Sequence, residues 1–214
     1  MLTIDDLKRE LELLRNRFMS KWSPADPSHL PEDFEHDVKA YCLLSHAVFE
    51  DFAEGISLAA LKLAKDSWMA KKFSPGTIPL LATYGFRLEI SDDEDIEQNR
   101  LFDQIREGLD DSVRQHSHAI VNNHGFSLKY LRAILMPVGI DVPESVKVME
   151  SLRELARARG SYAHSQAKQA MYGDSRRAFR PMAPEGAIVA VSDCFELCVK
   201  LAERLAAIEH TVNA

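Results

Sequence analysis

The stretch FEHDVKAYCLLSHAVFEDFA, residues 34–53, lies within a longer segment, residues 31–73, that predicts a helix. Pro31 suits the first turn of a helix, where its missing N–H would have no partner in any case. Three of the next four residues are acidic and complement the positive end of the helix dipole. Gly55 either divides the segment or allows another helix to approach closely. We therefore expect one unusually long helix, or two that join near this glycine.

Another amphipathic helix is predicted at the N-terminus, over residues 3–20. Thr3 is a suitable N-cap, and leucine and phenylalanine side chains recur every three to four residues. The following residues, 23–31, contain three prolines and predict a linker. We therefore divide the chain into an N-terminal helix with its proline-rich linker, residues 1–30, and a helical domain, residues 31–214. The N-terminal helix is expected to pack either on that domain or on a partner.

The rest of the chain also predicts helices, separated by segments that contain glycine and proline. Residues 74–91 carry two prolines and predict a loop or a short irregular element, with room for a brief β-strand at 86–90. Further helices are expected over 92–121, over 127–136, from about 143 onward and, after a loop at 173–186, over 187–210. The sequence therefore predicts an all-α protein, a bundle of about five or six helices.

The composition indicates an ordinary globular protein. Its 214 residues, 46% of them hydrophobic, are enough for one substantial core. The first residues, MLTIDDLKRELELL, lack the basic start and apolar block of a signal peptide, and no apolar run approaches the length that crosses a bilayer. Three cysteines are an odd number and argue against a disulfide framework, so Cys194 and Cys198 are predicted to be small buried side chains. We therefore expect a cytoplasmic protein that does not enter the membrane.

Charge is distributed unevenly along the chain. The net charge of −7 argues against broad, non-specific binding of nucleic acid. Residues 147–180 nevertheless contain eight basic and three acidic side chains, so this segment carries +5 and the remainder −12. The basic segment has two interpretations: it is an ordinary solvated helix surface, or it meets an RNA ligand on one face.

Within the basic segment, residues 159–164 read RGSYAH. Arg159 carries a planar, permanently charged group that pairs with phosphate oxygens, and His164 can transfer protons near neutral pH. These two groups suffice in principle to cleave RNA without a metal ion or other cofactor. No metal site is predicted elsewhere, because His116 and His118 would point about 200° apart on a helix. Arginine and histidine occur at this spacing by chance, so the surrounding sequence has to support the argument.

Four segments supply that support. They are FEHDVKAYCLLSHAVFEDFA at 34–53, NNHGFS at 122–127, LRAILMPVGID at 131–141 and LRELARARGSYAH at 152–164. Together they resemble the HEPN superfamily, and most closely the HEPN branch associated with predicted RNases of the RiboL-PSP group, over most of residues 32–210. The resemblance implies a HEPN-like helical bundle and places the family's acidic residue at Glu50.

The resemblance also implies an activity and the residues that carry it. In a metal-independent endoribonuclease of this type, an RNA 2′-hydroxyl attacks the adjacent phosphorus and leaves a 2′,3′-cyclic phosphate. Arg159 would stabilise the phosphoryl charge, His164 would act as general acid or base, and two copies of the chain would build a composite site in a homodimer. The implied setting is bacterial toxin–antitoxin, stress or antiviral defence, in which a neighbouring gene can encode a protein partner.

Helical geometry restricts how the two motif residues can meet. A separation of five residues turns a regular α-helix through about 500°, which leaves Arg159 and His164 about 140° apart. Either Gly160 interrupts the helix and bends the chain, or residues of two copies face each other across a two-fold axis. Arg153, Arg157 and His164 fall on one face instead, and Arg157 also fits the looser spacing of the family's motif.

Other residues are candidates for supporting roles. Glu50 follows His46 by one helical turn, so the two are predicted to pair. His46 is expected in the core, and Glu50 either forms a structural ion pair or orients the motif residues. Asn123 and His124 either end a helix or contribute to the wall of the site. The remaining candidates, which would position substrate or donate to a phosphate, are Ser161 and Tyr162.

Two departures from active relatives keep other functions open. Gly160 follows the motif arginine, where active members commonly carry a polar residue, and Gln166 replaces the tyrosine that partner nucleotidyltransferases modify in some toxins. The alternative function is therefore a non-catalytic HEPN protein that binds RNA or a protein partner. A third is a helical scaffold or immunity protein that docks through residues 3–20.

Overall fold

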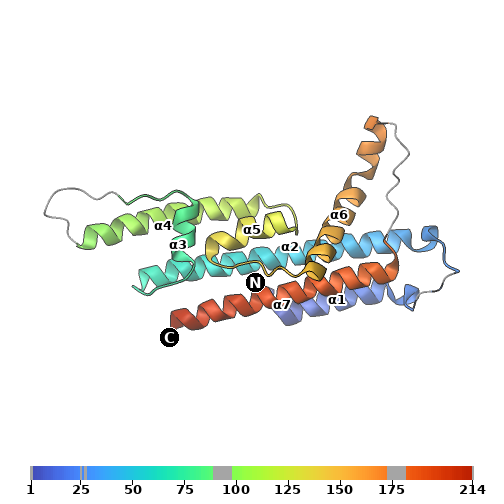
Figure 1. The fold of residues 1–214 in the computed structure, drawn as a ribbon, viewed down its shortest axis with the longest axis horizontal. Coiled ribbons are helices and arrows are strands. Elements are labelled where there is room, and N and C mark those ends of the chain that lie inside the picture. Colours follow the sequence, from blue (N-terminus) through green and yellow to red (C-terminus); the bar gives the residue numbers. More distant parts are fainter. Residues whose placement is uncertain (1, 25, 27, 89–97, 173–181, 214) are drawn as a thin grey trace.

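The computed structural model describes residues 2–24, 26, 28–88, 98–172 and 182–213, and for 98–100 and 161–172 it describes the helical backbone alone. These residues form seven α-helices and two 3₁₀ turns (Figure 1). Their bounds are α1 Ile4–Phe18, η1 Ser20–Trp22, α2 Pro31–Met69, α3 Thr77–Thr83, α4 Gln98–Val121, α5 Leu128–Leu135, η2 Met136–Val138, α6 Val146–Tyr172 and α7 Pro184–Asn213. The all-α prediction is confirmed. The helix count slightly exceeds five or six because α3 forms where a loop or irregular element was expected, and residues 86–88 form no strand.

Helix α2 is the longest element and the centre of the bundle. It runs for 39 residues without a break at Gly55, so the alternative of two helices is wrong. Pro31 occupies its first turn as predicted, and the Leu30 backbone N–H donates to the Asp33 carboxylate at 2.8 Å. Each of the other helices contacts α2, with α1 and α7 lying along it (Figure 1). The long helix therefore sets the positions of the others.

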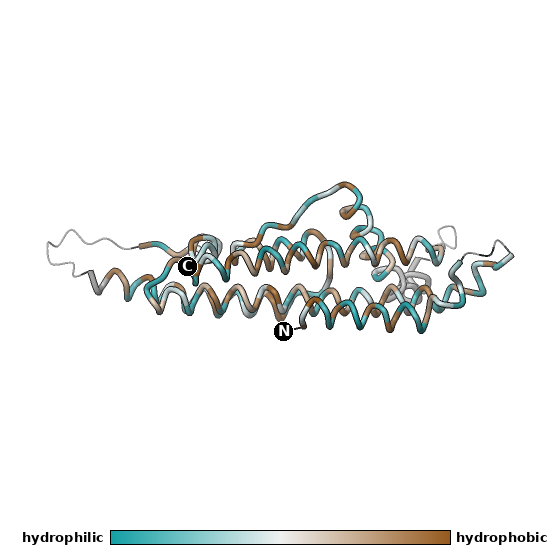
Figure 2. The backbone as a smooth tube through the Cα atoms, turned by 90° about the horizontal axis from the view of Figure 1, so that it is seen from below, coloured by the Kyte–Doolittle hydropathy of each residue, from teal (hydrophilic) through white to brown (hydrophobic). Residues whose placement is uncertain are grey.

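Helix α1 begins as the sequence predicts. The Thr3 hydroxyl accepts the Asp6 backbone N–H at 3.1 Å, and the Asp6 carboxylate accepts the Thr3 N–H at 3.2 Å, which satisfies two N–H groups at the helix start. Leu7 and Leu11 are buried in the same core as α2 and α7. Figure 2 shows hydrophobic residues recurring along the helices at the spacing of one turn. Of the two expectations for this helix, packing on the rest of the chain is the one observed.

The structure also bears on the expectations drawn from composition. The three cysteines are free thiols and are buried, as predicted for Cys194 and Cys198. Burial raises the pKa of the Cys42 thiol to about 12, so this thiol stays protonated and is a poor nucleophile. Within the described chain, no helix combines the length and the apolar character that crossing a membrane requires.

A buried polar network joins α4 to α2, to α5 and to the residue that ends α3. The Ser57 hydroxyl donates to the Ile134 carbonyl at 2.6 Å, so it accepts the Nε2–H of His116 at 3.0 Å. His116 Nδ1 in turn accepts the Tyr84 hydroxyl at 2.8 Å. Burial lowers the pKa of His116 to about 4, which keeps the ring neutral, as this arrangement requires. His118 is exposed, so these two histidines do not converge on a metal site.

We predict that His116→Ala lowers the free energy of unfolding by about 2–4 kcal/mol, because it opens a cavity and leaves the Tyr84 and Ser57 groups without their buried partner. Urea unfolding at neutral pH measures this loss. His118→Ala, on the same helix but exposed, is the matched control and should change the value by no more than about 0.5 kcal/mol. Similar small losses for both variants would show that the network contributes little to stability.

Candidate functional site

Helix α6 carries the motif. It packs on α2 and α7, and its last turns extend beyond the rest of the bundle (Figure 1). Leu155 and Ala158 are buried on its inner side. Arg159, the next residue, is half-buried, whereas Arg157 is exposed. The two arginines are about 200° apart on the helix and therefore meet different surroundings.

The helix continues through Gly160 to Tyr172, so of the two alternatives the one in which this glycine interrupts the helix and bends the chain is wrong. No described atom lies within 4 Å of the place that a Cβ would take at Gly160, so no close contact there requires a glycine. The continuous helix leaves Arg159 and position 164 about 140° apart. The side chains of the predicted residues Ser161, Tyr162 and His164 lie outside the described residues. Within one protomer, the backbone therefore directs the two motif positions to different sides of α6.

Three polar residues on α2 are spaced one turn apart, and the charge of Arg159 acts on the first two of them. We call them the α2 row: His46, Glu50 and Glu54. Burial raises the pKa of Glu50, and the adjacent Glu54 carboxylate raises it further. Arg159, the His124 side chain and a hydrogen bond from the Gly125 N–H lower the pKa of Glu50 without cancelling the rise. Glu50 is therefore the carboxylate at which charges from α2, α6 and the loop after α4 meet.

His46 connects the α2 row to that loop, residues 122–126, which we call the site loop. Its Nε2 accepts the Phe126 backbone N–H at 3.1 Å, and its Nδ1 lies 3.6 Å from Glu50 Oε2. Burial, together with the charge of Arg159, lowers the pKa of His46 to about 4, so the ring is neutral and carries its hydrogen on Nδ1. His46 is thus a core histidine that pairs with Glu50, as the sequence predicted.

The third member of the α2 row holds the start of the site loop. The Asn123 side-chain amide donates to the Glu54 carboxylate and to the Gly125 carbonyl, each at 3.3 Å. The Tyr130 ring covers Gly125 so closely that a Cβ there would lie 3.0 Å from the ring. His124, between these buried residues, is exposed. The loop is therefore fixed on both sides of His124 while this side chain faces solvent.

The structure brings together four residues that the sequence singled out, namely Arg159, Glu50, Asn123 and His124. Glu54 was missed, although its spacing of four residues from Glu50 was a signal that both lie on one face of a helix. The backbone N–H groups that the α2 row binds could not be identified from sequence, because every residue other than proline carries one. The catalytic and supporting roles of these residues stay predictions.

Arg157 lines a hollow between α6 and α7 and not the surroundings of Arg159. Arg153 lines the same hollow, and so does Lys147, whose Nζ lies 2.7 Å from Asp193 Oδ1. Asp193 is buried and also accepts the Ser151 hydroxyl at 2.7 Å. The basic face of α6 therefore combines exposed arginines with an ion pair that joins α6 to α7.

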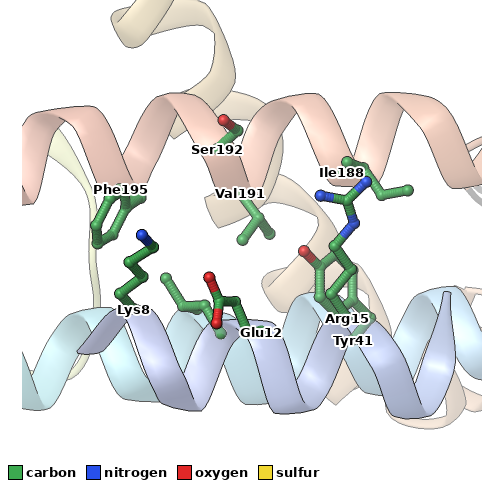
Figure 3. A pocket seen from close by; sticks show the side chains of 9 residues that line it. Lys8, Glu12, Arg15, Tyr41, Ile188, Val191, Ser192 and Phe195 are labelled. Atoms are coloured by element: carbon green, nitrogen blue, oxygen red, sulfur yellow. The ribbon is translucent and has the colours of Figure 1, made fainter. Parts of the chain in front are cut away.

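Another hollow lies between α1, α2 and α7 (Figure 3). Lys8, Glu12 and Arg15 project from α1 toward α7, and Tyr41 of α2 lies beside Arg15. Burial raises the pKa of the Tyr41 phenol, against the opposing charge of Arg15. The hollow includes none of the predicted site residues and carries mixed charge, so its chemistry does not match the motif.

No group of three or more histidine, cysteine, aspartate or glutamate side chains in the described part of the chain is arranged to hold a metal ion. In comparison with known proteins, the chain matches a family model described as RiboL-PSP-HEPN over residues 5–205. No curated protein and no solved structure matches significantly. The matched range contains the α2 row, the site loop and Arg159, so the family model spans every part of the candidate site.

We predict that His46 makes the protein less stable in acid. Its pKa is about 4 in the folded chain against 6.5 for an unperturbed histidine. The unfolded chain therefore binds this proton first, and the stabilisation present above pH 6.5 is lost as the pH falls toward 4, by on the order of 3 kcal/mol. His46→Gln, whose amide oxygen can still accept the Phe126 N–H, should lose less between pH 7 and pH 4.5 in urea unfolding. An equal loss in wild type and His46→Gln would contradict this, and His118→Gln is the exposed control.

We also predict that Gly160→Ala stabilises the protein by about 0.5–1 kcal/mol, because alanine favours a continuous helix and a Cβ there meets no described atom. Thermal unfolding measures the change. Gly108→Ala is the matched contrast, since a Cβ at this helical glycine would lie 2.1 Å from the Phe86 ring and should destabilise. Loss of stability in Gly160→Ala would show that another surface packs on this position.

Proposed function

Because the chain belongs to the RiboL-PSP-HEPN family, we propose that it is a metal-independent RNA endonuclease whose active site is built around Arg159 and His164. The observation that carries the proposal is the placement of Arg159. It is half-buried on α6, next to a buried histidine and a carboxylate whose pKa is raised, and within a match that covers most of the chain. Perturbed titratable groups around an arginine are typical of sites that bind and transform anions.

The proposed chemistry uses the RNA's own 2′-hydroxyl as nucleophile. A general base removes its proton, the 2′-oxygen attacks the adjacent phosphorus, and the bond from phosphorus to the 5′-oxygen breaks. The leaving 5′-oxygen takes a proton from a general acid, which gives a 2′,3′-cyclic phosphate and a 5′-hydroxyl end. Arg159 stabilises the charge on the phosphoryl oxygens, and His164 transfers a proton. Ser161 and Tyr162 position the substrate.

A homodimer explains how residues on different sides of α6 can act together. The helix is continuous at Gly160, which leaves Arg159 of one copy free to meet His164 of a second copy across a two-fold axis. The last turns of α6, which extend beyond the bundle, are available for such pairing (Figure 1). We place this activity in the cytoplasm of a bacterium, in toxin–antitoxin, stress or antiviral defence, with a partner protein encoded nearby.

The alternative is a non-catalytic HEPN protein that binds RNA or a protein partner. Two observations favour it: Gly160 follows the motif arginine, and the chain carries a net charge of −7. Binding without catalysis would use the same Arg159 surroundings but would not require His164. The two functions therefore differ in what the loss of His164 does.

We expect the wild-type protein to cleave labelled tRNA or mixed cellular RNA in excess chelator, leaving 2′,3′-cyclic phosphate ends, and to leave DNA intact because DNA lacks the 2′-hydroxyl. Arg159→Ala and His164→Ala should each lower the rate by roughly 100-fold or more while folding and dimerising normally. Arg114→Ala, an exposed arginine on α4 whose ion pair is with Asp111 of the same helix, is the control and should retain most activity. Intact dimers that cleave nothing would favour the binding protein, and dependence on a metal would contradict the mechanism.

Subunit mixing tests the composite site in the same assay. Arg159→Ala and His164→Ala chains with different affinity tags are co-expressed, and the mixed dimer is purified. If each site takes Arg159 from one copy and His164 from the other, one of its two sites contains both residues and about half of the wild-type rate returns. If both residues act in one protomer, the mixed dimer stays inactive.

A further inference from the structure

His124 occupies an unusual position in the site loop. Its side chain is exposed, while Asn123 before it and Gly125 after it are buried. A surface turn does not need buried contacts on both sides of an exposed histidine. The arrangement holds one titratable side chain at a fixed place beside Glu50, the carboxylate on which Arg159 also acts.

The contacts that fix His124 come from the whole α2 row. Glu54 accepts the Asn123 amide at 3.3 Å, Glu50 accepts the Gly125 N–H, and His46 accepts the Phe126 N–H at 3.1 Å. Three side chains at successive turns of one rigid helix therefore bind three successive parts of the loop. Such support from buried neighbours is what keeps a reacting group in position before substrate arrives.

The proposed reaction needs two proton-transferring groups, one for the 2′-hydroxyl and one for the 5′-oxygen. The continuous α6 separates Arg159 from position 164 of the same chain by about 140°. His124 is the exposed histidine on the loop that the α2 row holds next to Glu50. Resting on the proposed function, we infer that His124 and Arg159 of one protomer face the same phosphate and that His124 is the general acid for the 5′-oxygen.

The proton balance assigns the second role to His164 of the other copy. That histidine takes the proton from the 2′-hydroxyl as the new bond to phosphorus forms, and His124 gives its proton to the 5′-oxygen as the old bond breaks. Glu50 is suited to support an acid at position 124, because its negative charge and a positive imidazolium stabilise each other. No proton is gained or lost overall, and the two histidines exchange their protonation states.

The first test compares His124→Ala with His210→Ala, an exposed histidine near the end of α7. We expect His124→Ala to lower kcat by about 100-fold or more with little change in KM, imidazole in solution to restore part of the rate, and His210→Ala to remain near wild type. An RNA with sulfur at the 5′-bridging position has a leaving group that needs no acid. On this substrate the His124→Ala defect should largely disappear, whereas that of His164→Ala should persist. The role of His124 as acid is wrong if His124→Ala is as defective on the sulfur-substituted RNA as on ordinary RNA, or if it has no defect on ordinary RNA.

Mixed dimers show which residues share a protomer. A dimer of His124→Ala and Arg159→Ala chains should stay inactive, because each of its sites lacks one of the two residues. A dimer of His124→Ala and His164→Ala chains should regain about half of the wild-type rate, because one site keeps all three residues. The opposite pattern would place His124 with the Arg159 of the other copy.

A readout that does not need cleavage separates this inference from the proposed function. The imidazole resonance of His124, assigned by its absence in His124→Ala, should move when an RNA oligonucleotide blocked by 2′-deoxy substitution is added. It should not move in Arg159→Ala. If the protein cleaves RNA but the His124 resonance does not move on addition of the oligonucleotide, the inference about His124 is wrong and the proposed nuclease function stands. If the protein cleaves no RNA, both the nuclease function and the role of His124 as acid are wrong. In that case, a His124 resonance that moves only when Arg159 is present would still support a phosphate contact shared by the two residues.

Discussion

Packing against α2 is the constraint on which the rest of the molecule depends. At 39 residues, or about 58 Å, this helix is too long to bury one stripe against a single neighbour, and its buried residues continue from Val38 to Ser67. Each of the other helices contacts it, so α2 contributes to the burial of each of them. The row of His46, Glu50 and Glu54 lies on the same helix, between the core residues Cys42 and Ile56. The site therefore shares its rigid support with the core.

The sequence was sufficient for the class of fold because helical signals are local. Thr3 and Pro31 mark helix starts through their own hydrogen-bonding chemistry, which neighbours in space do not alter. The sequence was less informative wherever tertiary packing decided the outcome. Gly55 could divide the segment into two helices or form part of one, and in the bundle it is part of the single helix α2. Pro75 and Pro79 signalled an irregular segment, yet α3 forms there with Leu80 fully buried, because burial against the bundle outweighs weak local propensity.

The candidate site was predictable to the extent that its residues repeat at helical spacing or carry distinctive chemistry. His46 and Glu50 are one turn apart, and Arg159 belongs to the RGSYAH stretch, which combines an arginine with a histidine. Residue spacing could not predict that α2 and Asn123 are in contact, because they are about 70 residues apart in sequence. The contact is the hydrogen bond that the Asn123 amide donates to Glu54. The effect of Gly160 was also undecidable from sequence, because glycine permits both a bend and a helix and only the surrounding chain selects one.

The overall negative charge of the chain is compatible with the proposed binding of phosphate by Arg159, because the electric field that matters there is local. Charges more than about 8 Å away are largely screened at physiological salt, so the acidic remainder of the chain acts weakly at the site. Glu50 does interact electrostatically with Arg159, so its charge would compete with a phosphate for the guanidinium. An arginine can bind a carboxylate and a phosphate at the same time, because its five N–H donors lie along different edges of one plane. A lysine ammonium has no such fixed arrangement of donors. Under the proposed function, an RNA ligand would therefore add contacts of its own at this site, such as one to His124, because a bare phosphate backbone would gain little there. The proposed function thus predicts that this acidic protein binds RNA at one place and not along its surface.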